Sequence, residues 1–213
     1  MDGPIAEPDA LAPTLYAVIE RRRSVRAYRL EPIEEALIER LVRAASLAPS
    51  PHNRQPWRFV LLRGAAAGQL ADAMGARLAE DRRRDGDAEE AILRDVARSR
   101  ARIAAAPALL LVCATLEEMD AYPDAKRREA EYLMAVQGTA MAAQNLMLAA
   151  AAEGLATCWL CAPLFCPETV RRTLLLPEAW RPQGLITLGL PAAAGKLRPR
   201  KPPQDVFVER RIP

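Results

Sequence analysis

The chain has 213 residues, 51% of them hydrophobic, which is enough for one domain with a substantial core. Its 30 basic and 27 acidic residues give a net charge of only +3, which argues against general nucleic-acid binding. The first residues lack the basic and apolar stretches of a secretory signal, and the four cysteines then indicate reduced thiols. We therefore expect a single cytoplasmic domain over 1–213, with residues 1–13 flexible.

The apolar pattern and the prolines predict secondary structure along the whole chain. In chain order we expect a helix over 12–24, a helix over 33–48, a strand over 57–62, helices over 65–84 and 88–106, a strand over 107–115, a helix over 132–152, a strand over 154–161, a helix over 166–176 and a strand over 183–191. Strands separated by long helices predict a layered α/β-type domain with more helix than sheet. The tail 195–208 has too many prolines for a helix, and we expect it to add a strand to a partner subunit.

Residues 132–152 carry no charged side chain and are long enough to span a bilayer. Four polar residues lie within this segment, however, and its many alanines supply little hydrophobic drive. A helix that is apolar on nearly all sides also suits the centre of a soluble helical layer or a dimer interface. We favour the interface, so a membrane is not an expected partner.

The sequence contains no G-x-G-x-x-G, P-loop or G-x-S-x-G motif. His52 is the only histidine, which excludes a His-rich metal site, and Ser50 with His52 lacks the oriented third group of a hydrolase triad. The spacing of Cys158, Cys161 and Cys166 is compatible with zinc or iron–sulfur ligation, but a strand would turn the first two to opposite faces. We interpret them as buried apolar residues and expect no metal. An enzyme with so few acid–base side chains needs an organic cofactor.

Three polar clusters are candidates for holding such a cofactor. Arginines and a serine at 21–26 suit a phosphate and hydroxyl groups, although an isolated arginine run is also typical of a solvated turn. The loop 50–55 offers amides for the edge of a heterocycle, or it simply caps turns. The tail carries Arg198, Arg200 and Lys201, and the first two point to one side of an extended chain, unless the tail is merely flexible.

In their order along the chain, these clusters resemble the nitroreductase family of FMN-dependent oxidoreductases. The resemblance runs from about Leu15 onward through the segments "RRRSVRAY", "APSPHNRQPWRF", "GLATCWL" and "ITLGLP" and the basic, proline-rich tail. Within the family, two segments look closest to the flavin-binding C-terminal domain of the glutamyl ligase of deazaflavin cofactor biosynthesis: "YPDAKRREAE" and "GLATCWLCAPLFCPETVRRTLLLPEAW". A 213-residue chain has no room for the ligase domain itself.

The resemblance implies an α+β sandwich, with a central mixed sheet flanked by helices, that assembles as a homodimer with two FMN sites at the interface. Helix 132–152 would be buried in that interface, and the C-terminal tail would extend onto the partner. By position, the FMN phosphate, ribityl chain and pyrimidine edge fall to Arg22, Arg23, Ser24, Arg26, Arg198 and Arg200. The loop that reaches the flavin of the other subunit matches Ser50, Pro51 and Asn53, with His52 and Gln55 beside them. The strand end against the ring matches Trp159, Leu160 and Cys161, and a close-approach position on the long helix matches Gly138.

The activity implied is hydride transfer from NAD(P)H through flavin N5 to a small organic electron acceptor such as a nitroaromatic or a quinone. Cys161 stands where close relatives have glycine beside N5, so its thiol is the candidate catalytic group, although an inert thiol is the simpler interpretation. Other activities stay open: reduction of a deazaflavin precursor, oxygen-dependent flavin fragmentation, and non-catalytic flavin binding. An arginine-rich interaction protein without a cofactor is a fourth possibility.

Overall fold

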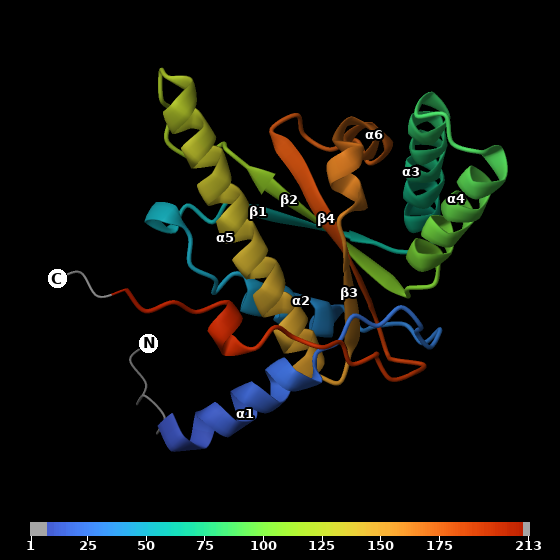
Figure 1. The fold of residues 1–213 in the computed structure, drawn as a ribbon. Helices are drawn as coiled ribbons and strands as arrows, with labels where there is room; N and C mark the ends of the chain where they lie inside the picture. The colour runs from blue at the N-terminus through green and yellow to red at the C-terminus, as the bar shows by residue number, and fades with distance from the viewer. Residues whose placement is uncertain (1–7, 211–213) are drawn as a thin grey trace.

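The computed structural model describes residues 8–210 and shows an α+β domain built on one sheet with helices on both faces (Figure 1). The sheet has the order β1-β2-β4-β3 and consists of β1 (Trp57–Leu62), β2 (Ala108–Thr115), β3 (Ala156–Leu160) and β4 (Trp180–Gly189). The helices are α1 (Pro8–Arg21), α2 (Glu35–Ala45), α3 (Gly64–Arg84), α4 (Glu89–Ala104), α5 (Ala125–Ala152) and α6 (Pro167–Thr173).

All neighbouring strands of the described sheet pair antiparallel, so the expected mixed sheet is wrong. The connections explain this. β1 leads into α3 and α4, and a connection made of two antiparallel helices brings the chain back for an antiparallel β2. β2 and β3 run in the same direction, as their connection through the single helix α5 requires, but β4 lies between them. The parallel pairing in the described chain is an isolated bridge between Ser24 and Thr157.

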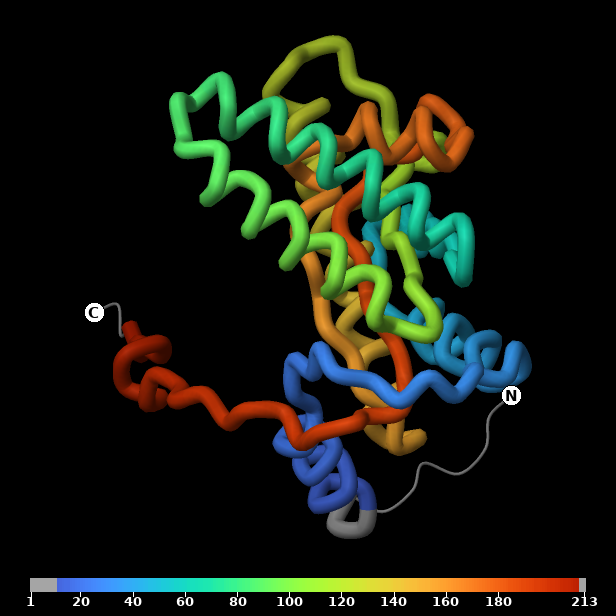
Figure 2. The backbone as a smooth tube through the Cα atoms, turned by 90° about the vertical axis from the view of Figure 1, so that its right-hand side faces the viewer, coloured from blue at the N-terminus to red at the C-terminus, as the bar shows by residue number. Residues whose placement is uncertain are grey.

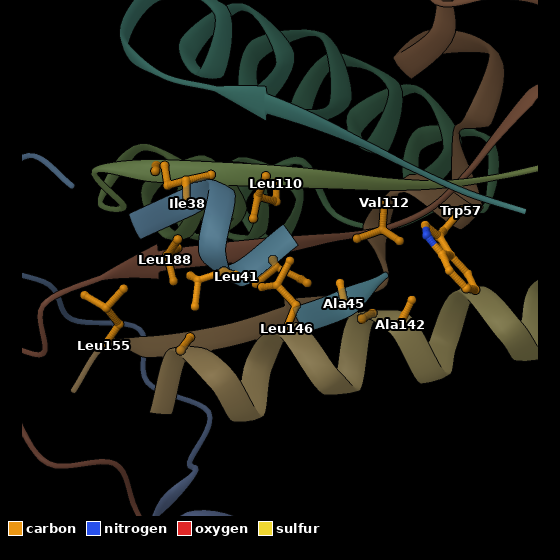
Figure 3. Close-up of a cluster of buried hydrophobic side chains, with 14 of the residues drawn as sticks. Ile38, Leu41, Ala45, Trp57, Leu110, Val112, Ala142, Leu146, Leu155 and Leu188 are labelled. Atoms are coloured by element: carbon orange, nitrogen blue, oxygen red, sulfur yellow. The ribbon is translucent and has the colours of Figure 1, made fainter. Parts of the chain in front are cut away.

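The core consists of two layers because β2 is buried on both faces. Alternate residues of a strand point to opposite faces, and β2 follows this rule. Leu110 and Val112 pack with α2 and α5, through residues such as Leu41 and Leu146 (Figure 3). On the other face, the second layer gathers side chains from β2, β4, α3, α4 and α6: Leu109, Leu111, Leu185, Leu70, Ile103 and Val170. This double burial explains the continuous apolar run of β2.

Helix α5 is longer than the uncharged segment alone predicts, because its first turn is charged and capped. The Asp124 side chain accepts a hydrogen bond from the backbone N–H of Arg127, which satisfies a donor at the helix start. One stripe of the helix is buried against the sheet, and an opposite stripe that includes Leu133 and Met141 is exposed in this single chain. Across the described residues, no helix is both long and apolar enough to cross a membrane.

The other expected elements are present with shifted ends. The first helix begins at Pro8 instead of residue 12, and the last strand begins at Trp180 instead of residue 183. In β4 the register against β2 shifts near Pro182, which has no N–H to donate to the ladder. The expectation of flexibility over 1–13 falls partly on residues 1–7, which lie outside the described residues, while residues 8–13 form the start of α1.

Candidate functional site

The arginine-rich segment that follows α1 is extended and lies along the edge of the sheet beside β3. Ser24 forms a parallel bridge with Thr157, and the backbone N–H of Val25 donates to the Thr157 carbonyl at 3.0 Å. Further along, the buried Tyr28 hydroxyl hydrogen-bonds the Val25 carbonyl and the Thr187 hydroxyl, each at 2.6 Å. The backbone of the arginine segment is therefore anchored to the sheet, Arg22 and Arg23 are half-buried, and Arg26 is exposed.

The tail returns across this segment after β4. The N–H of Ala192 donates to the Ala27 carbonyl at 3.0 Å, and the tail crosses the segment that follows α1 (Figure 2). Gly195 lies close against this segment, because a Cβ there would lie 2.4 Å from the Arg23 Cβ and 3.1 Å from a Val25 methyl group. Only a residue without a side chain allows the two segments to lie this close together.

A cavity of about 770 Å³ lies between the arginine segment and the tail. Its lining includes six of the residues that the sequence assigned to the first and third clusters, but not Lys201: Arg22, Arg23, Ser24, Arg26, Arg198 and Arg200. The lining also has two side-chain hydrogen-bond donors that the sequence did not assign to the site, Lys196 from the tail and Gln144 from the exposed stripe of α5. The alternation of Arg198 and Arg200 extends back to Lys196, so this signal was available in the sequence, whereas nothing local marked Gln144.

The cavity has a strong surplus of positive charge. Five arginines and Lys196 line it, against the single carboxylate of Glu20. Among the described residues, no carboxylate forms an ion pair with any of these six cations, and the Arg23 guanidinium donates instead to the backbone carbonyls of Glu20 and Arg22. The arginines of α3 and α4 differ sharply, since many are paired: Arg77–Asp81, Arg82–Asp95, Arg83–Glu89, Arg84–Glu80 and Arg100–Asp72. Unpaired cations that converge on one cavity favour an anionic ligand.

The loop 50–55 lies elsewhere in the chain and does not line this cavity. It contains the short helix η1 (Pro51–Asn53), and three of its non-glycine residues have left-handed φ values, His52 at 48°, Asn53 at 53° and Gln55 at 49°. The loop packs on α5 at Gly138, where an added Cβ would meet the Ser50 Cβ at 3.5 Å. Gly138 thus contacts this loop and not the cationic cavity, and within one chain the second cluster stays apart from the other two.

The end of β3 presents the predicted ring-contacting residues in a defined arrangement. The Trp159 indole packs on Gly184, where a Cβ would lie 2.3 Å from the ring, and its N–H donates to the Cys161 sulfur at 3.1 Å. Leu160 is the last residue of β3, so Cys161 lies beyond the strand and is exposed. The interpretation of the cysteines as buried apolar residues is therefore wrong for Cys161.

The other two cysteines of the pattern are buried, as expected, and burial raises the pKa of the Cys158 and Cys166 thiols. Within the part of the chain that the structure describes, no three residues among His, Cys, Asp and Glu gather as a metal site.

Comparison with known proteins identifies the family to which this arrangement belongs. The sequence profile of the nitroreductase family matches residues 19–190, which include the arginine segment, the loop 50–55 and all four strands. The chain belongs to the nitroreductase family.

Similar proteins match this chain over almost their whole length. A 5,6-dimethylbenzimidazole synthase of Rhodospirillum rubrum is 32% identical, over 89% of this chain and 87% of the relative. An NADH dehydrogenase of Thermus thermophilus is 30% identical, over 89% of this chain and 93% of the relative. The crystal structure of the FMN-dependent nitroreductase NfnB from Mycobacterium smegmatis, in complex with NADPH, has 26% identity and a TM-score of 0.75, covering 94% of this chain and 100% of that one. The finer likeness to the deazaflavin ligase domain is not tested by these proteins and stays a prediction.

Proposed function

We propose that this protein is an FMN-dependent oxidoreductase that passes reducing equivalents from NAD(P)H to a small organic acceptor such as a nitroaromatic or a quinone. The observation that carries the proposal is the cavity between the arginine segment and the tail, where six cations converge that have no carboxylate partner among the described residues. Membership of the nitroreductase family and the FMN-dependent, NADPH-bound relative support it.

The side chains around the cavity fit FMN. Its phosphate carries close to two negative charges, which the guanidinium groups of Arg22, Arg198 and Arg200 would neutralise through charge-assisted hydrogen bonds. The Ser24 hydroxyl and the Gln144 amide, which line the same cavity, suit ribityl hydroxyl groups. Arg26 lies further along the extended segment, where it would meet the pyrimidine edge of the ring.

When bound, FMN supplies reversible two-electron chemistry that takes a hydride from NAD(P)H and delivers electrons to the acceptor. The chain's own residues bind and orient the ring. Arg26 would stabilise negative charge at the pyrimidine edge of the ring, because a fixed cation needs no reorganisation when that charge develops. Trp159, fixed by Gly184, holds the strand end in one arrangement and orients the Cys161 sulfur.

A complete site on this proposal requires two chains. The loop 50–55 does not reach the cavity of its own chain, so we place it at the flavin of a partner subunit in a homodimer. The exposed apolar stripe of α5 supports this assembly, because an exposed uncharged helix face is typical of an interface.

The first experiment is a visible spectrum of the purified protein, followed by anaerobic addition of NADH or NADPH. We expect flavin bands that bleach with the reductant and return with a nitroaromatic or a quinone. A colourless protein that fails to take up added FMN would overturn the proposal. Retained flavin without acceptor-dependent oxidation of NAD(P)H would instead indicate a non-catalytic flavin-binding protein.

A second candidate function is oxygen-dependent fragmentation of the flavin. It is favoured by the 32% identical relative named as a 5,6-dimethylbenzimidazole synthase, since that product contains the dimethyl-substituted benzene ring of flavin. Loss of flavin absorbance under air with excess reductant would support this function. Full recovery of the oxidised flavin spectrum under the same conditions would exclude it. Turnover of a deazaflavin precursor, but not of nitroaromatics, would instead favour the finer family likeness.

A further inference from the structure

The loop 50–55 has an unfavourable backbone that something must hold in place. Three of its six residues, His52, Asn53 and Gln55, have left-handed φ values although none is a glycine, and all three are exposed. Left-handed conformations are unfavourable for residues that carry a Cβ, and they persist only where the surroundings enforce them. Exposed side chains supply little packing, so the enforcement must come from hydrogen bonds and charge.

Internal bonds close the loop on itself. The N–H of Asn53 donates to the Ser50 carbonyl at 3.1 Å, and the N–H of Arg54 donates to the Pro51 carbonyl at 2.9 Å. The N–H of Gln55 donates to the Ser50 hydroxyl at 3.0 Å. These bonds set the curvature of the loop, but they do not fix where it lies relative to the sheet.

The connection between β2 and α5 supplies that external contact. The Arg54 guanidinium donates to a carboxylate oxygen of Asp120 at 2.9 Å, across 66 positions of sequence. Next to this ion pair, the N–H of Thr115 donates to the Pro56 carbonyl at 2.8 Å, which joins the end of β2 to the start of β1. The Arg54–Asp120 ion pair thereby attaches the loop to the 116–124 connection, and the Thr115–Pro56 bond holds the strands that flank the loop and the connection together.

The 116–124 connection is itself well anchored, so it can serve as a support. At its start, the Thr115 hydroxyl donates to the Glu117 carboxylate at 2.9 Å. At its end, Asp124 caps α5 through the N–H of Arg127, whose guanidinium also lies 4.8 Å from the centre of the Tyr122 ring. Asp120 therefore projects from a segment that is fixed on both sides.

We propose that Asp120 is a positioning residue for the flavin site. Through Arg54 it holds the loop 50–55 in its left-handed conformation before the cofactor arrives, so binding does not have to order the loop. The expected effect on FMN binding rests on the proposed function, in which the loop 50–55 lies at the flavin of the partner subunit. The ion pair itself requires only the geometry described above.

The test compares Asp120→Asn with two other variants. Asp120→Glu keeps the charge, so we expect it to retain most of the wild-type amide protection and FMN affinity. Glu89→Gln breaks a similarly exposed ion pair with Arg83 in the α3–α4 hairpin, so it controls for the general cost of losing a surface pair. Amide hydrogen exchange of residues 53–55 is measured first, in the flavin-free protein, and the Kd for FMN is then measured by titration.

We expect Asp120→Asn to speed exchange of the three loop amides and to weaken FMN binding by about twofold to fivefold, the range of an exposed ion pair. Glu89→Gln should leave both unchanged. If the loop amides of Asp120→Asn exchange as slowly as those of wild type, the inference is wrong, whatever the Kd for FMN. Faster exchange in a protein that never binds FMN would uphold the loop support and overturn the proposed function instead.

Discussion

At Gly195, one missing side chain decides whether the tail can close the cationic cavity. We expect Gly195→Ala to weaken FMN binding by about tenfold, because the added Cβ overlaps Arg23 and relief of such overpacking costs about 1–3 kcal/mol. The measurement is an FMN titration of the flavin-free protein. Gly68→Ala in α3 is the matched control, since a Cβ there meets nothing within 4 Å. Equal affinity of the two variants would contradict the closed arrangement of the tail.

Deprotonation of the buried Tyr28 phenol is expected to lower the stability of the fold at alkaline pH. Burial raises the pKa of its phenol from 10.0 to about 12, so the folded state holds the proton more tightly than the unfolded state. The stabilisation is complete below pH 10 and is lost as the pH rises to about 12. We expect the free energy of unfolding to fall by about 2–3 kcal/mol across that window from this residue.

Denaturant unfolding at about pH 9, 10 and 11, around the onset of the phenol titration, checks the expectation. Tyr28→Phe should be less stable at neutral pH, because it loses the bonds to Val25 and Thr187, but its stability should fall less steeply above pH 10. Buried thiols contribute to the remaining slope, since burial raises the pKa of Cys113 to about 12 and also raises the pKa of Cys158 and Cys166. If the free energy of unfolding falls with pH equally in the variant and wild type, Tyr28 does not cause the loss of stability at alkaline pH.

Among the elements, helix α5 contains a buried polar group that lowers its stability. Its Thr139 is buried, yet the hydroxyl has no hydrogen-bond partner among the described residues. An unpaired buried hydroxyl is destabilising, so we expect Thr139→Val, which has nearly the same shape, to raise the free energy of unfolding by about 1 kcal/mol. Thr139→Ser keeps the hydroxyl and should not stabilise. Loss of stability in the valine variant would mean that the hydroxyl has a partner in the assembled protein.

For the whole molecule, the assembly is the decisive prediction. Met141 lies on the exposed stripe of α5, and we expect Met141→Glu to produce a monomer, because a buried charge without a partner disfavours an interface. Sedimentation measures the mass, and FMN should be lost together with the dimer if the loop 50–55 comes from the partner. Leu93→Glu, on an exposed position of α4, should leave the assembly unchanged. A monomeric wild-type protein that binds FMN would refute the two-chain site.

The sequence by itself determined the elements and the residue types of the candidate site. Apolar periodicity located the helices and strands because burial on one or both faces fixes the spacing of apolar residues. Arginine side chains can be read as phosphate ligands without coordinates, since their chemistry does not depend on the fold. The resemblance then joined the arginine segment, the loop 50–55 and the tail into one cofactor site, and the family is confirmed.

Only the tertiary structure decided how these parts meet. β1 and β2 pair antiparallel because α3 and α4 form a hairpin between them, and a run of apolar residues does not encode its own direction. Gln144 reaches the cavity, and Asp120 reaches Arg54, across long stretches of sequence. Cys161 is exposed because β3 ends one residue earlier. Contacts between residues distant in sequence depend on the packing of whole elements, and local patterns carry no record of that packing.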